Sequence, residues 1–303
     1  MSAPVIVCQE LQKRYDGLLA VNDVSFEVAR GEIFGLLGPN GAGKTTTVEC
    51  LQGLRRADGG QVRVLGLDPQ RQARQLRRRI GSQLQQSALP DHIRSWEALD
   101  LFAALTPGAT NWRELLEQWG LTSKRRAAFH SLSGGQRQRL FVALALVNEP
   151  ELVFLDEMTT GLDPAARRAT WDLISEIRER GVTVILVTHF MEEAERLCDR
   201  VAIMDAGRIV ALDRPCNLIQ KHAGGVHLTF TTKLDNVAWL NQLAEVDEVK
   251  QQGRYVHVRG RGAVLARVAH ALVEHGAAPA DLTLERPTLE DVFLHLTGHE
   301  MRE

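Results

Sequence analysis

An apolar run that leads into a glycine-rich turn and a helix constrains this chain more than any other feature. The run Ile33–Leu37 is continuous and apolar, as is typical of a strand buried on both faces of a sheet. The residues after it match the pattern G-x-x-x-x-G-K-[ST] in full: Gly38, Pro39, Asn40, Gly41, Ala42, Gly43, Lys44 and Thr45. A helix is expected to follow from about Lys44 to Leu54. Together, the strand, turn and helix predict a phosphate-binding loop in an α/β fold.

The residue types in this loop suit phosphate binding. Glycines let the backbone wrap closely and aim N–H groups at phosphate oxygens, and the helix N-terminus adds a favourable positive potential. We expect Lys44 to bridge the β- and γ-phosphates of a nucleotide and the Thr45 hydroxyl to bind Mg²⁺, with Thr46 also contacting the nucleotide. The alternative is a glycine-rich turn with a solvated lysine, and the agreement of every position argues against it.

A second apolar run ends in two carboxylates. Leu152–Leu155 predicts a buried strand, and Asp156 and Glu157 follow at its carboxyl end, where open α/β sheets bind their ligands. We expect Asp156 to occupy the Mg²⁺ position, acting through water, and Glu157 to polarise the attacking water as a general base. An acidic pair after a strand is common, so this interpretation depends on the phosphate-binding loop.

The remaining periodicity completes an alternation of strands and helices. Helices are expected over residues 136–148 and 165–180, a buried strand over Val182–Val187, and a hairpin around Asp205-Ala206-Gly207. Residues 70–130 are predicted to be mostly helical, with little strand signal. Further strands are expected at 24–28 and 61–65. This alternation implies an open, mostly parallel sheet.

Composition narrows the class of protein. The chain has 303 residues, 44% apolar and 24% charged, which is ordinary globular composition. Its 36 Lys and Arg nearly balance 38 Asp and Glu, so net charge does not suggest nucleic acid as a partner. The four cysteines lie far apart without a C-x-x-C pair, which argues against a disulfide framework or zinc site and favours a reducing compartment. No apolar run approaches the ~20 residues that span a bilayer, and Val5–Cys8 is too short for a signal peptide.

A second domain is expected after about residue 220. Beyond Lys221–Gly225 the predicted order is strand, helix, strand, strand, helix, strand, which is a ferredoxin-like pattern. The expected ranges are 226–232, 236–244, 246–251, 254–259, 263–275 and 282–286. A last helix begins at Thr288, with Asp291 three residues on as a capping box. We therefore expect an α/β domain over residues 1–220 and a small α+β domain over residues 221–303.

The pentapeptide Leu132-Ser133-Gly134-Gly135-Gln136 decides the class. By itself it predicts a serine-capped helix N-terminus, a second anion-binding position for which one chain has no evident need. It resembles the signature motif of ATP-binding cassette (ABC) proteins, and the resemblance covers about residues 5–220. The resemblance implies a P-loop NTPase cassette with a mostly parallel sheet, antiparallel N-terminal strands and a helical subdomain at about residues 86–135.

Three more positions resemble ABC motifs. Tyr15 resembles the aromatic residue that stacks on adenine, although a lone aromatic also suits a half-buried core position. The segment Gly161-Leu162-Asp163-Pro164 resembles the D-loop, which communicates across a dimer, and it implies that Asp163 contributes to the nucleotide site. His189 follows Val187 and Thr188 at a strand end, and it resembles the switch histidine that contacts the γ-phosphate.

The Q-loop has an open register, and two segments depart from the family. Gln85 resembles the glutamine that reaches Mg²⁺ and the attacking water, while Gln83 and Gln86 are close alternatives. Met158 stands where the family often has proline, which should change loop stiffness more than chemistry. Ser87–Leu99, the segment that would face a membrane partner, matches the family only loosely.

The resemblance also implies an assembly. In ABC proteins two cassettes pair head to tail, and ATP lies between the phosphate-binding loop of one and the signature motif of the other. The implied ligands are ATP and Mg²⁺, and the implied reaction is hydrolysis of ATP to ADP and phosphate. The implied partners are a second copy of the chain and a separate polytopic membrane permease, with the chain held peripherally at the cytoplasmic face of the membrane and no nucleic acid bound.

Residues 288–297, Thr-Leu-Glu-Asp-Val-Phe-Leu-His-Leu-Thr, resemble a C-terminal motif of drug-resistance-type (daunorubicin-resistance-like) ABC exporter ATPases. An amphipathic helix packed on the small domain would share this pattern. The resemblance favours export of drugs or other hydrophobic or amphipathic compounds. The alternatives are a soluble ABC ATPase acting on nucleic acid or the ribosome, and a non-hydrolysing regulator, against which Glu157 and His189 argue. The basic run Arg71–Arg79 is more typical of a solvated helix face than of contact with phospholipid or nucleic acid.

Overall fold

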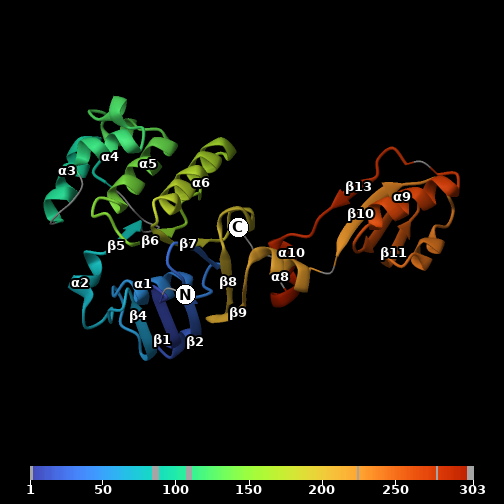
Figure 1. Cartoon of the computed structure of the whole chain (residues 1–303), viewed down its shortest axis with the longest axis horizontal. Coiled ribbons are helices and arrows are strands. Elements are labelled where there is room, and N and C mark those ends of the chain that lie inside the picture. Colours follow the sequence, from blue (N-terminus) through green and yellow to red (C-terminus); the bar gives the residue numbers. More distant parts are fainter. Residues whose placement is uncertain (1–2, 84–88, 107–110, 224, 278, 299–303) are drawn as a thin grey trace. The chain divides into compact units, whose positions relative to one another are not determined.

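The computed structural model describes residues 3–83, 89–106, 111–223, 225–277 and 279–298. The chain divides into two compact units, Met1–Pro215 and Cys216–Glu300 (Figure 1). Among the described residues, no helix combines the length and the apolar character needed to cross a membrane.

The larger sheet of the first unit has the strand order β5-β6-β7-β3-β8-β9. Its strands are β3 (Ile33–Leu37), β5 (Ile80–Gln83), β6 (Leu152–Asp156), β7 (Thr183–Thr188), β8 (Arg200–Asp205) and β9 (Arg208–Asp213). Neighbouring strands are parallel except for the β8–β9 hairpin, so the predicted mostly parallel sheet is confirmed. The apolar strands β3, β6 and β7 are buried along their whole length. Because these three are neighbours, the residues that follow them meet at one edge of the sheet.

The second sheet of this unit is antiparallel, as expected for the N-terminal strands. It consists of β1 (Ile6–Tyr15), β2 (Leu18–Val28) and β4 (Gly59–Val64) in the order β2-β1-β4. The two sheets share a core, within which Phe26 of β2 stacks on Phe34 of β3 with ring centroids 5.1 Å apart. This packing fixes the N-terminal strands beside the strand that leads into the phosphate-binding loop.

The helices of the first unit include one, over Met191–Leu197, that the sequence analysis did not predict. They are α1 (Lys44–Leu51), α2 (Ala73–Arg77), α3 (Ser95–Leu105), α4 (Trp112–Gln118), α5 (Gly134–Ala145), α6 (Pro164–Glu179) and α7 (Met191–Leu197), with 3-10 turns at Thr122–Lys124 and Phe129–Ser131. Figure 1 shows α3, α4 and α5 grouped together, and α3 contacts both of the others. The sequence interpretation missed β5, because Gly81 and Ser82 interrupt its apolar pattern and only pairing with β6 stabilises it as a strand.

The second unit contains a four-stranded antiparallel sheet. Its strands are β10 (Val226–Thr231), β11 (Val246–Gln252), β12 (Tyr255–Gly260) and β13 (Thr283–Glu285), in the order β11-β12-β10-β13. One long helix, α9 (Val264–Glu274), packs on this sheet. The expected helix 236–244 is instead a short 3-10 helix, η3 (Ala238–Gln242). The Ala238 N–H donates to the Asn236 side chain, and Val237 and Leu240 are buried in the core of this unit. Two further helices are α8 (Pro215–His222) and α10 (Leu289–Thr297). Thr288 and Asp291 form the predicted capping box of α10.

Candidate functional site

The loop after β3 has a backbone that requires glycine at two positions. Gly38 and Gly43 have φ angles of 150° and 94°, in the region that side chains disfavour. A Cβ atom at Gly38 would lie 2.2 Å from the Met204 carbonyl oxygen, and one at Gly43 would lie 2.4 Å from that of Ala20. The loop is therefore wrapped against β8 and β2 as closely as a bare backbone allows.

Lys44 begins α1 and folds back over this loop. Its side chain is buried, and Nζ donates hydrogen bonds to the carbonyl oxygens of Gly38 at 2.7 Å and Pro39 at 2.9 Å. Burial lowers the pKa of Lys44, and the charges of Glu157 and Asp156 act in the opposite direction. The ammonium group thus stands largely desolvated against neutral carbonyls, a position from which an anionic phosphate would be a stronger partner.

Asp156 ends β6 beneath the loop. It is 3% exposed, and its Oδ1 is a buried oxygen without a hydrogen-bond partner in the described part of the chain. Burial and then the charge of Glu157 raise the pKa of Asp156 to about 6, while Lys44 and the Thr45 hydroxyl lower it. A buried carboxylate oxygen without a donor, next to a hydroxyl on α1, is an arrangement that a hard cation would complete.

Glu157 takes up a left-handed backbone conformation directly after β6, with φ of 49°. Its backbone N–H donates to the Val187 carbonyl at 2.9 Å, which ties the turn to β7. Its carboxylate oxygen Oε1 lies 3.3 Å from Nδ1 of His189, the residue after β7. The side chains are 8% and 20% exposed, respectively, so the pair stands at the rim of the sheet with limited access to water.

A cleft of about 460 Å³ opens over these groups. It is lined by Tyr15, Ala20, Asn40, Gly41, Gly43, Lys44, Thr45, Thr46 and Glu157. The structure therefore brings most of the predicted loop residues, the half-buried Tyr15 and the predicted base around one cavity, whereas Gly38, Pro39 and Ala42 do not line it. Ala20 was missed, because nothing in a strand alanine signals contact with a ligand. Arg55 was missed too, and its guanidinium lies 5.2 Å from the centre of the Tyr15 ring.

The signature segment stands apart from this cleft. Ser133 is the N-cap of α5 and forms a capping box with Gln136, and Gly134 is exposed. Asp163 caps α6 through the N–H groups of the next turn. None of these residues lines the cleft among the described residues. The starts of α5 and α6 form a second, separate part of the predicted site.

The Q-loop prediction falls partly outside the described residues, because Gln85 and Gln86 lie there. Gln83 is described and ends β5. It is buried, and its Oε1 accepts a hydrogen bond from Nε2 of Gln138 on α5 at 3.2 Å. This hydrogen bond joins the end of β5 to α5, so the side-chain amide of Gln83 helps to hold α5 against the sheet.

A buried carboxylate behind the site was also missed. Glu193 of α7 is fully buried, and Oε1 accepts a hydrogen bond from Nε1 of Trp171 at 3.0 Å. Burial raises the pKa of Glu193, and the hydroxyls of Thr188 and Thr159 act against this. These threonines belong to the segments that carry His189 and Asp163. The available signal was its position on the apolar face of α7.

Comparison with known proteins agrees with this geometry. The family model described as ABC transporter matches residues 21–160. The chain is 38% identical to the daunorubicin resistance ATP-binding protein DrrA3 of Streptomyces coeruleorubidus, over 100% of this chain and 98% of that protein. It is 39% identical to the Nod factor export ATP-binding protein I of Cupriavidus pinatubonensis, over 99% of this chain and 92% of that protein.

Solved structures show the same fold. The structure of cbiO1 from Clostridium perfringens, described as part of the ABC transporter complex cbiONQ, has a TM-score of 0.66 and 26% identity, over 73% of this chain and 92% of that one. A structure described as the ATP-binding subunit of an ABC transporter has a TM-score of 0.64 and 28% identity, over 72% of this chain and 92% of that one. With its phosphate-binding loop, carboxylates and signature segment in one cassette, the chain belongs to the ABC transporter family, as an ATP-binding subunit that hydrolyses ATP.

Proposed function

We propose that this chain is the ATPase subunit of a membrane exporter and that it energises a separate polytopic permease. The observation that carries the hydrolytic part is the contact between Glu157 and His189 at the edge of the cleft that holds Lys44. We assign this activity to residues 1–220, with the helical subdomain at about residues 86–135, and regard residues 221–303 as a separate small domain.

In this proposal the loop binds the phosphates of ATP. Backbone N–H groups at the start of α1 face the β-phosphate, and Lys44 exchanges its carbonyl partners for phosphate oxygens. Tyr15 stacks on the adenine ring at the other end of the cleft. The desolvated state of the Lys44 ammonium makes this exchange favourable, because charge-assisted hydrogen bonds are stronger than those to neutral carbonyls.

The residues present fit a magnesium ion. Asp156 offers a buried oxygen that lacks a donor, and Thr45 offers a hydroxyl beside it. These two residues would hold the ion, with Gln85 as a further ligand by family resemblance. When bound, Mg²⁺ neutralises charge on the phosphates.

Hydrolysis requires a base near the γ-phosphate. Glu157 lines the cleft, and its carboxylate accepts a proton from the attacking water as the water oxygen bonds to the γ-phosphorus. The bond between that phosphorus and the β–γ bridging oxygen breaks, and ADP leaves with the bridging oxygen. His189, beside this carboxylate, contacts the γ-phosphate and holds Glu157 in place. Gln85 acts on the same water in this proposal.

A second copy of the chain completes the site. The exposed N-terminus of α5, with Ser133, Gly134, Gly135 and Gln136, does not line the cleft of its own chain. We assign these residues, with Asp163, to the ATP bound by the partner in a head-to-tail dimer. ATP then supplies donors to both copies and favours the closed dimer, and hydrolysis removes the link.

Export is the direction that the whole-chain relatives favour, since their names record daunorubicin resistance and Nod factor export. We propose drugs or other hydrophobic or amphipathic compounds as cargo, and a peripheral position on the cytoplasmic face of the membrane. A soluble ABC ATPase acting on nucleic acid or the ribosome is the alternative, and the relatives reported above do not favour it.

Co-purification from detergent-solubilised membranes tests the proposal. The tagged chain should recover a polytopic membrane protein in stoichiometric amount, and mass spectrometry should identify it. The Ser133→Arg variant, in which the ATP-dependent dimer should not form, shows whether recovery of the membrane protein depends on that dimer. Recovery of ribosomes or nucleic acid without a membrane protein would overturn the exporter assignment and favour the soluble alternative.

A further inference from the structure

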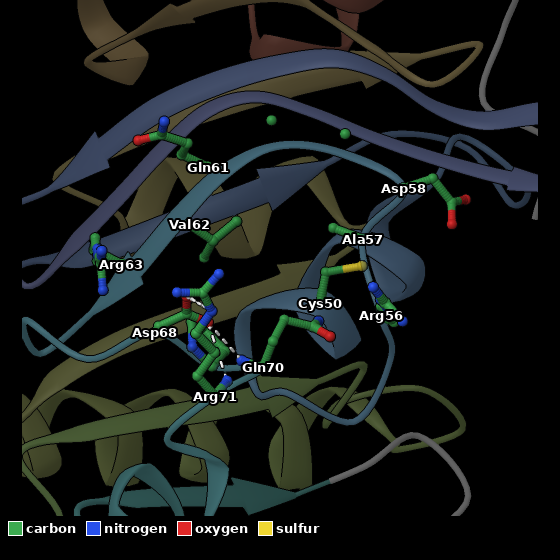
Figure 2. Close-up of a pocket in the computed structure, with 13 residues that line it drawn as sticks. Cys50, Arg56, Ala57, Asp58, Gln61, Val62, Arg63, Asp68, Gln70 and Arg71 are labelled. Carbon is green, nitrogen blue, oxygen red and sulfur yellow. Dashed lines mark hydrogen bonds and ion pairs between the residues drawn. The ribbon is translucent and has the colours of Figure 1, made fainter.

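A second pocket of about 430 Å³ lies in the first unit (Figure 2), and it shares no lining residue with the ATP cleft. It is formed by β4, by residues 56–58 before that strand and by residues 68–71 after it. Arg56, Arg63 and Arg71 are exposed on it, while Val62 and Pro69 provide an apolar part. The pocket therefore presents guanidinium groups beside a small apolar surface.

The two carboxylates of this pocket are already satisfied. Asp58 accepts hydrogen bonds from the Arg14 backbone N–H at 2.7 Å and from Lys13 Nζ at 3.0 Å. Asp68 accepts from the backbone N–H groups of Gln70 at 2.9 Å and Arg71 at 3.2 Å, as Figure 2 shows. Hydrogen bonds and neighbouring arginines hold the pKa of both carboxyls below their usual range, so both are ionised and occupied at neutral pH.

The arginines are not satisfied to the same degree. Arg71 lies 3.9 Å from Asp68, whereas Arg56 and Arg63 form no ion pair or side-chain hydrogen bond with any described residue. Three guanidinium groups thus face two carboxylates, one of which is paired with Lys13. The pocket therefore has an excess of positive charge, although Arg63 and Arg71 both act electrostatically on Asp68.

The positive charge continues onto α2. Arg74, Arg77 and Arg78 are exposed and likewise form no ion pair within the described ranges. The neighbouring Arg79 is different, since it is held by Glu151 at 2.6 Å and by the Leu65 carbonyl at 3.1 Å. Of the basic run in the sequence, Arg79 is structural, Arg71 lines the pocket, and Arg74, Arg77 and Arg78 form an exposed belt that follows it along the chain.

We propose that the pocket and this belt bind the headgroups of anionic phospholipids, with Arg56 and Arg63 as separate contacts to phosphates. The inference rests on the proposed function, which places the chain at a membrane that no described helix can cross. A headgroup supplies both a phosphate for the guanidinium groups and glycerol carbons for Val62 and Pro69. The belt is wider than one phosphate ion, and an anionic surface would contact all of it.

Single-stranded RNA offers the same phosphates but fits less well. Sequence-tolerant RNA sites stack bases on aromatic side chains, and the residues that line this pocket include none among those described.

Each arginine near an anionic bilayer raises affinity about fivefold, so two pocket arginines account for an effect on the order of tenfold or more.

Cosedimentation of the full chain with vesicles tests the proposal. Wild-type protein should bind vesicles that contain phosphatidylglycerol and should bind pure phosphatidylcholine vesicles much more weakly. The Arg56→Gln/Arg63→Gln variant should lose affinity for the anionic vesicles by at least about tenfold. The Arg254→Gln/Arg286→Gln variant removes the same charge from exposed positions of the second unit and should bind as wild type does. Basal ATP hydrolysis without vesicles should be unchanged in both variants, which shows that they are folded.

The result that overturns the proposal is equal binding of wild type and the pocket variant to anionic vesicles, or equal binding to both vesicle types. Binding of inorganic phosphate or single-stranded RNA that depends on Arg56 and Arg63, without binding to anionic vesicles, also overturns it. Failure of the proposed function would be seen in different measurements. The wild-type chain would then not hydrolyse ATP, or would not recover a permease from membranes, whether or not it binds vesicles.

Discussion

Nδ1 of His189 lies 3.3 Å from Oε1 of Glu157, although 32 residues separate them in the chain. The contact follows from the register of two parallel strands, in which Asp156 of β6 pairs with Val187 of β7. Glu157 is the residue beyond one strand, and its N–H is bonded to the other strand at Val187. The pair that we assign to hydrolysis is therefore positioned by the central sheet itself.

Replacing the base should separate binding from hydrolysis. Glu157→Gln keeps the size of the side chain but removes the proton acceptor, so ATP turnover should fall by about 10²–10⁴-fold while ATP still binds. ATP should then trap a dimer, which gel filtration would show. Glu179→Gln, at an exposed position of α6, should leave turnover unchanged. Hydrolysis at the wild-type rate in Glu157→Gln would show that another group is the base.

Removing the lysine should act at an earlier step. Lys44→Ala deletes a cation next to a polyanion, and a charge-assisted hydrogen bond contributes about 1.5–3 kcal/mol, so ATP affinity should fall by at least about tenfold and turnover with it. The fold should persist, since the ammonium is desolvated in the free protein. Nucleotide titration and phosphate release measure the two effects, with the exposed Lys124→Ala as control. If both quantities stay at wild-type values, the loop is not the phosphate site.

Ser133 tests the composite site. Ser133→Arg adds bulk and charge at the exposed start of α5 but leaves the cleft around Lys44 intact. ATP binding by the monomer should survive, while ATP-dependent dimerisation and turnover fail together. A variant that dimerises and hydrolyses ATP normally would favour a self-contained ATPase.

Mixing two inactive variants refines this test. A mixed dimer of Ser133→Arg and Lys44→Ala chains has one site with an intact loop and an intact signature segment, and a second site with both lesions. Independent sites predict recovery of up to half the wild-type activity, whereas sites that must act together predict none. Phosphate release as a function of the mixing ratio distinguishes the two, and each variant measured alone provides the baseline.

Glu193 should make stability depend on pH. Burial raises its pKa above 4.5 in the folded state, so the protonated form favours folding, and this contribution is present below pH 4.5 and lost as the pH rises through the raised value. Glu193→Gln stays neutral and can still accept the Trp171 hydrogen bond. Its free energy of unfolding should be closest to that of wild type below pH 4.5. The variant's advantage should grow by at most about 1.4 kcal/mol per pH unit as the pH rises toward the raised pKa, and stay constant above it. A difference that does not change with pH would contradict this, and Glu179→Gln is the control.

The cysteines should differ sharply in reactivity. Cys216 is exposed, whereas Cys8, Cys50 and Cys198 are buried. Burial raises the pKa of Cys8 to about 12 and that of Cys50 to about 11, so both remain protonated, unreactive thiols at pH 8. A thiol-reactive chromophore should therefore label one cysteine quickly, and Cys216→Ser should abolish that phase. Denatured protein should show all four thiols, and more than one fast thiol in the native chain would refute the burial pattern.

Much of the fold could be predicted because its signals are local. Continuous apolar runs identified β3, β6 and β7, and the glycine pattern between β3 and α1 identified the phosphate-binding loop. The capping residues of α5 and α10 were visible in the same way. Each of these signals depends on residues a few positions apart, where side-chain type and spacing determine the backbone conformation.

The rest was decided by tertiary structure. The strand β5 exists because β6 pairs with it, and the 3-10 turn η3 replaces a helix because its apolar residues meet the core after a single turn. The sequence alone shows Arg74 and Arg79 as members of one basic run, but only Arg79 finds a carboxylate, from Glu151, 72 positions away. Residue types and local spacing thus determined which chemistry the chain could carry. Strand order and side-chain pairing decided which groups meet and which charges remain exposed, because those contacts join segments whose separation the sequence does not encode locally.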